Sequence, residues 1–240
     1  MILYVVIKGI SSKTVNGLLI QSLPPISKPK LRTSIEEIDG RDGDIVTTLG
    51  YSAYDKEFTI GLHGEYNVDD VIEYFNTEGT IVFSNEPDNY YNFALYEAID
   101  FNKLIRFKTA KVKIHVQPFK YSEDETTITN TYSEGTTNAT IRVRNDGNVY
   151  SKPMLTITGK GAITVYLGGT QILAMNLDDI TEETIIISSS EMNAYNESGA
   201  YMNRRVTGDY DNLVFKAGVN SLTIEGTITR VLIDNYSRWI

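Results

Sequence analysis

The chain has 240 residues, of which 41% are apolar, and its formal net charge is -9. This length suffices for two modest domains or for one large all-β domain. The absence of cysteine excludes disulfide frameworks, thiolate metal sites and cysteine nucleophiles. The acidic balance argues against a sequence-reading nucleic-acid binder, and no apolar run approaches the ~18 residues of a membrane span.

The N-terminal stretch "MILYVVIKGISSK" contains a short apolar patch. No basic leader precedes the patch and no small-residue cleavage site follows it. We therefore expect a first β-strand here rather than a signal peptide. The lack of cysteine fits synthesis in a reducing cytoplasm.

Residues 35–50, "IEEIDGRDGDIVTTLG", place five acidic residues around one arginine between two strand-like segments. An EF-hand calcium loop that began at Asp39 would need glutamate at its twelfth position, where Gly50 stands. The order Gly-Arg-Asp also excludes an Arg-Gly-Asp adhesion signal. The pair Asp42-Gly43 is a preferred hairpin turn, so the stretch predicts a hairpin with a charged tip.

Two segments alternate with the two-residue period of a half-buried strand. The first segment is "YDKEFTIGL", residues 54–62, and the side chains on its inward face would be Tyr54, Lys56, Phe58, Ile60 and Leu62. The second is "FKTAKVKIHVQPF", and the side chains on its inward face would be Ala110, Val112, Ile114 and Val116. The opposite face of the second segment carries Lys111, Lys113 and His115.

A single helix is predicted at about 68–78, where Val68, Val71, Ile72 and Phe75 follow the i, i+3, i+4, i+7 stripe. Asn67 is suited to cap its start, and two aspartates favour the first turn. Gly79 is suited to the left-handed backbone conformation that is common just past the end of a helix. We expect this helix to lie on a sheet.

The aromatic cluster "DNYYNFALY" at 88–96 has two interpretations. In the first interpretation, the aromatic rings of this cluster are exposed and stack on sugars. The favoured interpretation is a strand whose inward side chains are Tyr91, Phe93 and Leu95, with Tyr90 as a lone surface ring.

A composition change at 122–138 predicts a connector, because this stretch is acidic, rich in threonine and serine, and poor in apolar periodicity. Short strands at sandwich-like spacing follow it. The segments "LTITGKGAIT" and "LTIEGTIT" predict two glycine-centred hairpins. The polar stretch 188–212 predicts a surface loop, in which Tyr195, Tyr201 and Tyr210 are candidates for an exposed recognition surface.

No motif indicates catalysis. Adjacent acids on a strand point to opposite faces, whereas a glycosidase needs two carboxyls facing each other across a cleft. The acid pairs are Glu36–Glu37, Asp69–Asp70, Asp178–Asp179 and Glu182–Glu183. His63 and His115 stand in no metal-ligand spacing, and nucleophile elbows and phosphate-binding glycine loops are missing. We therefore predict no catalytic, cofactor-binding or metal-binding residue, and no enzyme.

The order of these features resembles the distal tail proteins of long-tailed phages with non-contractile tails. The N-terminal pieces are "GLLIQSLPPISKPKLR", the "IDGRDGDIV" hairpin with its "Y-x-K-x-F-x-I" strand, the single helix, "EGTIVFSNEPDNYYNFALYEAID" and "FKTAKVKIHVQPFKY". The C-terminal pieces are "NDGNVYSKPMLTITGKGAITVYLGG" and "NSLTIEGTITRVLIDNYSRWI". Together they span nearly the whole chain.

The resemblance implies a mainly β protein with two domains. Residues 1–125 would form a sandwich- or barrel-like domain with one helix, 126–138 a linker, and 139–240 a galectin-like β-sandwich. The first domain would build a hexameric ring, and its hairpin would reach the neighbouring subunit. The interface residues would be Asp39, Gly40, Arg41, Asp42, Gly43 and Asp44.

The implied function is structural. The ring would stand at the distal end of the tail in the virion, after synthesis in the host cytoplasm. It would join the tail tube protein to the tail-associated or baseplate hub protein and to a receptor-binding protein. Its channel would pass the tape measure and DNA, with no membrane insertion. The alternative is a carbohydrate-binding module that attaches to the host cell wall; a wall hydrolase lacks a motif.

Overall fold

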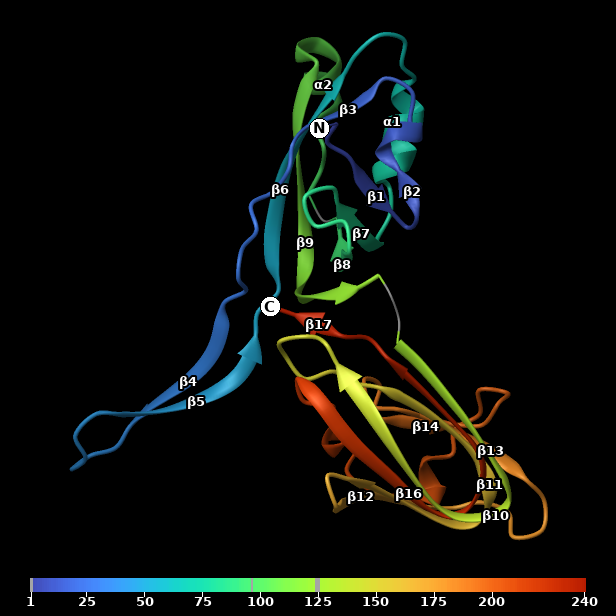
Figure 1. Cartoon of the computed structure of the whole chain (residues 1–240). Helices are drawn as coiled ribbons and strands as arrows, with labels where there is room; N and C mark the ends of the chain where they lie inside the picture. The colour runs from blue at the N-terminus through green and yellow to red at the C-terminus, as the bar shows by residue number, and fades with distance from the viewer. Residues whose placement is uncertain (1, 96, 124–125) are drawn as a thin grey trace. The chain divides into compact units, whose positions relative to one another are not determined.

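The computed structural model describes residues 2–95, 97–123 and 126–240. The chain divides into two compact units, Met1–Glu123 with Ile240 and Asp124–Trp239, here called the N-terminal and C-terminal units. Each unit has its own apolar core. The structure is mainly β, as the sequence predicts (Figure 1).

The main sheet of the N-terminal unit is antiparallel, in the order β2-β1-β7-β8-β9-β6-β3. Its strands are β1 (Val5–Ile7), β2 (Ile10–Ser11), β3 (Leu18–Ser22), β6 (Tyr54–Leu62), β7 (Gly79–Phe83), β8 (Asn89–Ala94) and β9 (Thr109–Ser122). A short 3-10 helix, η1 (Ser12–Thr14), follows β2.

The alternation predicted for β6 and β9 is confirmed. The buried side chains of the pair include Lys56, Phe58, Ile60, Leu62, Ala110, Val112, Ile114 and Val116. The opposite face carries ion pairs across the two strands, such as Lys111 with Glu57 at 2.6 Å and His115 with Asp55 at 2.7 Å. A period of two therefore fixes which face of this strand pair enters the core.

The predicted helix exists but is shorter than expected. Helix α1 (Val68–Phe75) begins at Asn67, whose side chain accepts a 3.0 Å hydrogen bond from the amide of Asp69. It ends at the cap Asn76, so the expected role of Gly79 is wrong. Gly79 instead opens β7 with φ +135, where a Cβ would lie 2.7 Å from the Lys8 side chain.

A second helix, α2 (Phe101–Phe107), corrects the prediction of a single helix. Its N-cap is Asp100, whose side chain accepts a 2.8 Å bond from the amide of Lys103. Leu104 is buried and Phe101 packs against the core of the N-terminal unit. Phe101, Leu104 and Ile105 follow the i, i+3, i+4 spacing, but a helix of seven residues shows this spacing only once, so the periodic signal is weaker than that of α1.

The predicted inward positions of β8 are confirmed for Tyr91 and Phe93, which are buried. Tyr90 is not a lone surface ring, however. It stacks on Tyr121 of β9 with ring centroids 5.4 Å apart. The prediction failed because the ring's partner lies on a neighbouring strand and 31 positions along the chain.

The main sheet of the C-terminal unit has the order β10-β16-β11-β12-β15, with β13 paired to β11 and β14 to β13. The elements of this unit are β10 (Thr126–Asn145), β11 (Met154–Leu167), β12 (Thr170–Asn176), β13 (Glu183–Ser188), β14 (Asn193–Tyr195), η2 (Asn203–Arg205), β15 (Val206–Gly208), η3 (Tyr210–Asn212), β16 (Gly218–Asn235) and β17 (Arg238–Trp239), of which β17 is not part of the main sheet. The long strands bend, and the sheet encloses one apolar core (Figure 1).

Residues 126–138, expected as a linker, form the first part of β10 instead. They pair with β16 in register, for example Ile128 opposite Ile233. Ile128 and Tyr132 pack against the core of the C-terminal unit. The β-branched threonines that resembled a connector are also good strand formers, which is why the composition misled the prediction.

The two predicted hairpins are continuous strands that bend at glycine. β11 pairs with β13 before its bend and with β12 after it. At Gly159 a Cβ would lie 2.3 Å from the Thr227 carbonyl oxygen, and at Gly226, with φ +131, 2.5 Å from that of Ala162. The glycines therefore allow close backbone approach at a bend rather than a tight turn.

Candidate assembly surface

The predicted hairpin is present in the N-terminal unit. Strands β4 (Leu31–Glu37) and β5 (Asp44–Tyr51) form a two-stranded sheet of their own. Every residue of the two strands is exposed or only partly buried. Figure 1 shows the hairpin as a ribbon that projects from its unit. Both outer edges consequently carry backbone groups without a strand partner among the described residues.

The tip differs in detail from the predicted turn. Glu37 pairs with Asp44, so residues 38–43 form the connection rather than a two-residue turn at Asp42-Gly43. The amide of Arg41 donates a 3.1 Å bond to the carbonyl of Ile38, and Gly40 has φ +83. That conformation at the third residue of the turn is the one a type II turn requires.

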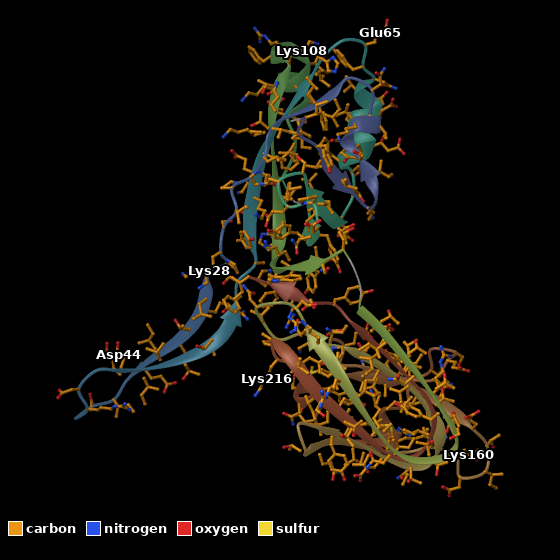
Figure 2. The ribbon with its side chains drawn as sticks, in the orientation of Figure 1. Lys28, Asp44, Glu65, Lys108, Lys160 and Lys216 are labelled. Atoms are coloured by element: carbon orange, nitrogen blue, oxygen red, sulfur yellow. The ribbon has the colours of Figure 1, made fainter. Side chains whose placement is uncertain are left out.

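The six predicted interface residues, 39–44, are consecutive and all exposed, and Figure 2 labels the last of them, Asp44, on the hairpin. Among the described residues, none of its charged side chains is in an ion pair; these are Asp39, Arg41, Asp42 and Asp44. The tip therefore offers unpaired charges of both signs to another surface.

Exposed apolar side chains follow the tip along both strands. Ile35 and Val46 are 61% and 60% exposed, and Leu49 is 57% exposed. Ile35 and Val46 pair across the ladder, so their side chains leave the same face. Side chains of this kind on a projecting ribbon are typical of a protein-protein contact.

Three side chains hold the segment that leads into the hairpin. The Asn85 amide donates to the carbonyl of Pro24 at 3.4 Å. The Lys56 ammonium donates to the carbonyl of Pro25 at 3.3 Å, and the Tyr54 hydroxyl donates to the carbonyl of Ser27 at 3.4 Å. The root of the hairpin is therefore tied to the main sheet even though its tip is free.

Lys56 belongs to a buried polar cluster that the sequence did not reveal. Its ammonium lies 4.7 Å from the centre of the Tyr91 ring, and the Tyr91 hydroxyl donates to Glu86 at 2.8 Å. Glu86 is also paired with Lys120. Burial lowers the pKa of Lys56, and the Glu86 carboxylate partly opposes that shift.

The three tyrosines predicted as a recognition surface do not form one patch. Tyr195 and Tyr201 face each other with ring centroids 5.2 Å apart, and Tyr201 is 73% exposed. Tyr210 packs against the core, and its hydroxyl donates to Asn203 at 3.2 Å. Burial raises the pKa of Tyr210. The structure thus brings together two of the three candidates.

The described residues offer little to a metal ion. Across 2–95, 97–123 and 126–240, no group of three or more histidine, aspartate or glutamate side chains gathers closely enough to hold one. Of the helices in these ranges, none has the length and apolarity needed to span a membrane.

No known family model matches the chain, and no curated protein matches it in sequence. Among solved structures, the chain is similar to the SPP1 Dit (gp 19.1) protein, a paradigm of the hub adsorption apparatus in phages that infect Gram-positive bacteria. The match covers 100% of both chains, with a TM-score of 0.70 and 16% sequence identity.

A chain of the phage P2 baseplate in its activated conformation with Ca is also similar, over 98% of both chains, with a TM-score of 0.49 and 10% identity. The fold assignment rests on the SPP1 protein, whose fold the chain shares along its whole length. The predicted fold class, and the resemblance to distal tail proteins at the level of fold, are thereby confirmed.

Proposed function

We propose that this chain is a structural distal tail protein of a phage with a long, non-contractile tail. Six copies form a closed ring at the tail tip of the virion. The ring joins the tail tube to the baseplate hub and receptor-binding proteins, and its channel passes the tape measure and DNA. The projecting β4–β5 hairpin carries this proposal, within a fold shared with the SPP1 Dit protein.

The hairpin is poorly stabilised by its own subunit. An isolated two-stranded ribbon is marginal in water, because neither face is covered and both edges are open. Addition to a neighbour's sheet edge would satisfy the backbone groups and cover Ile35 and Val46. The same contact repeated head to tail gives a closed ring when the rotation between neighbours is a whole fraction of a turn, which is one sixth in this proposal.

The charged tip supports selectivity more than affinity. Arg41 lies between Asp39 and Asp42 on the exposed connection. Opposite charges on the receiving subunit would fix the register of the hairpin and reject wrong partners. Exposed ion pairs contribute only about 0–1 kcal/mol each, so most of the binding free energy would come from the strands.

The test is a charge reversal at the tip, Arg41→Glu with Asp42→Lys. We expect the native chain to form rings in light scattering and negative-stain images, alone or with its tube partner. The double variant should form fewer rings, because its reversed charges would meet like charges on the receiving subunit, and it should keep the circular dichroism of the native monomer. The matched control is Arg144→Glu with Asp146→Lys, an exposed pair in the C-terminal unit, which should leave the rings intact.

Two outcomes would count against the proposal. Rings at native yield from the tip variant would remove the tip from the interface. A native chain that stays monomeric at high concentration, and also beside the tail tube and hub proteins, would overturn the ring itself.

A further inference from the structure

Four places in the chain put an aspartate or an asparagine directly before a glycine: Asn16-Gly17, Asp39-Gly40, Asp42-Gly43 and Asp146-Gly147. Such a pair is open to an intramolecular reaction, in which the glycine amide nitrogen attacks the side-chain carbonyl carbon of the residue before it. The backbone must turn to bring these two atoms together, and glycine hinders the turn least because it has no Cβ. How firmly the fold holds each pair therefore decides which of the four reacts.

The two pairs of the hairpin tip are held loosely. A Cβ at Gly40 or at Gly43 would have nothing within 4 Å, and the aspartates before these glycines are exposed. Among the described residues, the one backbone hydrogen bond inside the connection runs from the Arg41 amide to the carbonyl of Ile38, so neither glycine amide is engaged in it. Local rearrangement of a loop with so few contacts costs little free energy.

The same dipeptide at Asp146-Gly147 is held firmly. The Gly147 amide donates a 3.0 Å hydrogen bond to the side chain of Asn145, and the Asp146 carboxylate is paired with Arg144. A Cβ on Gly147 would lie 2.1 Å from the carbonyl oxygen of Arg238, so the backbone has no space in which to turn. Attack by the Gly147 nitrogen requires these contacts to be broken first.

Asn16-Gly17 is held firmly as well. The carbonyl of Gly17 accepts a 2.9 Å bond from the amide of His63, and a Cβ on Gly17 would lie 2.5 Å from the Cβ of Tyr66. From the sequence alone this pair would react first, because an asparagine amide reacts as it stands, whereas an aspartate must be protonated before water can leave. The fold should slow it relative to the unfolded chain.

We propose that the hairpin tip is a site of spontaneous isoaspartate formation, at Asp39 and Asp42. The nitrogen of the following glycine bonds to the side-chain carbonyl carbon of the protonated aspartate. The carboxyl hydroxyl group and the amide proton leave together as water, which gives a five-membered succinimide ring. A water molecule then opens the ring. Cleavage at the side-chain carbonyl restores aspartate, and cleavage at the α-carbonyl gives isoaspartate, so no oxidant, reductant or enzyme is needed.

The product changes the tip without changing its net charge. In isoaspartate the backbone runs through the side-chain carbonyl, which lengthens the chain by one methylene group and leaves the α-carboxylate as the branch. The negative charges on both sides of Arg41 thereby move. A subunit that waits unassembled would accumulate this altered tip. Its effect on docking rests on the proposed function, whereas the modification itself does not.

The test follows each pair in the folded full chain and in the same chain held unfolded in guanidinium chloride. The ratio of the two rates removes the intrinsic reactivity of the dipeptide. Both samples are incubated in mildly acidic buffer and digested with trypsin, which cuts after Arg41 and so places the two tip sites in different peptides, 33–41 and 42–56. Isoaspartyl peptides have the mass of the aspartyl peptides but separate from them by chromatography, and electron-transfer fragmentation identifies them.

We expect Asp39 and Asp42 to isomerise at nearly the same rate in the folded and the unfolded chain. Asp146, the same dipeptide in the same sample, is the matched control, and folding should slow its reaction at least about tenfold. Folding should slow the reaction of Asn16 as well. Suppression of the tip sites as strong as that of Asp146 would overturn the proposal.

A substitution tests the chemistry. Asp39→Glu with Asp42→Glu keeps both charges, but a glutamate would have to close a six-membered ring, which forms far more slowly. The variant should therefore yield no isomerised tip peptide over the same period, while its Asp146 peptide behaves as in the native chain. An equal amount of modified tip in this variant would overturn the succinimide route.

This inference and the proposed ring can fail separately. The chain is kept dilute and monomeric during incubation, which light scattering verifies. A chain that isomerises at the tip but never forms rings, alone or beside the tail tube and hub proteins, would contradict the proposed function alone. A chain that forms rings on concentration, but whose monomer gathers no isoaspartate at the tip, would contradict this inference alone.

Discussion

Ile35 on β4 and Val46 on β5 lie directly opposite each other, and more than half of each side chain is exposed. If the hairpin docks on a neighbouring subunit, this pair becomes buried and an added charge there is costly. We expect Val46→Asp to reduce the ring fraction at least about tenfold, a loss of ~1.4 kcal/mol or more in the contact. Light scattering at matched concentrations measures the ring fraction of the variant and of the native chain.

The same substitution should leave the monomer almost unchanged, because Val46 contacts no core of its own subunit. Ile180→Asp is the matched control, since Ile180 is 85% exposed in the C-terminal unit. The Ile180→Asp variant should form rings at the native yield. A Val46→Asp variant that assembles as well as this control would show that this face of the hairpin stays in solvent.

Gly226→Ala should destabilise the C-terminal unit by about 2 to 4 kcal/mol. The added methyl group would meet the carbonyl oxygen of Ala162, and φ of +131 is strained for any residue but glycine. Denaturant unfolding of the full chain measures the loss. Gly168→Ala is the control, because φ there is also positive but nothing lies within 4 Å of the new Cβ. If both variants lost equal stability, close approach at the bend would not be the cause.

These glycines also show why part of the fold could not be predicted. The segment around Gly226 has the same local pattern in a tight hairpin and in a bent continuous strand. What distinguishes the two is the neighbouring strand, β11, which passes close to the bend. The sequence shows where the glycine is, but it does not show which strand will pass beside it. The β6 alternation was predictable because the period of two is a property of the strand itself.

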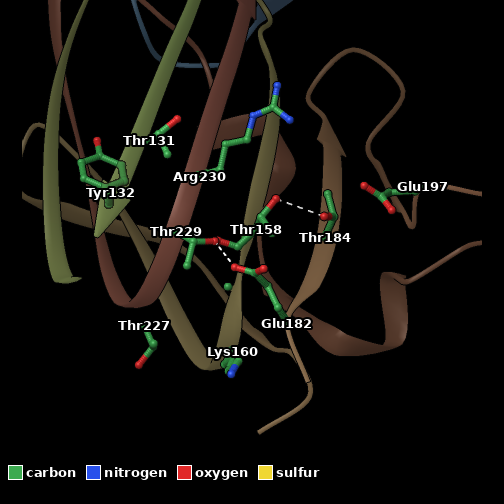
Figure 3. Close-up of a pocket in the computed structure, with 11 residues that line it drawn as sticks. Thr131, Tyr132, Thr158, Lys160, Glu182, Thr184, Glu197, Thr227, Thr229 and Arg230 are labelled. Atoms are coloured by element: carbon green, nitrogen blue, oxygen red, sulfur yellow. Dashed lines mark hydrogen bonds between the residues drawn. The ribbon is translucent and has the colours of Figure 1, made fainter. Parts of the chain in front are cut away.

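The same distinction applies to the candidate sites. The hairpin tip is contiguous along the chain, so its residues 39–44 can be singled out from the order of amino acids alone. A cavity of about 920 Å³ in the C-terminal unit is lined by residues that include members of β10, β11, β13 and β16, and only strand register brings Thr131, Thr158 and Arg230 side by side there (Figure 3). Tyr132, which also lines this cavity, could not be singled out from the sequence, because the composition of the residues around it resembles that of a connector.

Stability of the N-terminal unit should fall at alkaline pH because of Tyr74. Its hydroxyl donates to the carbonyls of Val5 and Ile10, both at 3.1 Å, and burial raises its pKa. Above about pH 10 the unfolded chain loses the tyrosine proton while the folded chain keeps it. Each further pH unit therefore favours unfolding by ~1.4 kcal/mol for this group.

Urea unfolding at about pH 9 and about pH 11 tests this, with Tyr74→Phe as the comparison. The variant should lose about 1–3 kcal/mol at neutral pH, because the carbonyl of Val5, in a buried contact, and that of Ile10, in a partly buried one, lose their donor. Its stability should then fall less steeply between the two alkaline values. Parallel curves for the two proteins would assign the alkaline loss to other groups.

Lys56→Met should loosen the root of the hairpin while changing the global free energy of unfolding by less than about 2 kcal/mol. The substitution removes the bond to the Pro25 carbonyl, but it also removes a buried charge whose lowered pKa shows that burial disfavours it. We expect faster hydrogen exchange at Ser52, whose amide donates to the carbonyl of Lys30 at 2.8 Å.

Lys111→Met is the control, because that lysine is exposed on the neighbouring strand and pairs only with a surface glutamate among the described residues. Unchanged exchange at Ser52 in the Lys56 variant would mean that the hairpin root is held without the ammonium group.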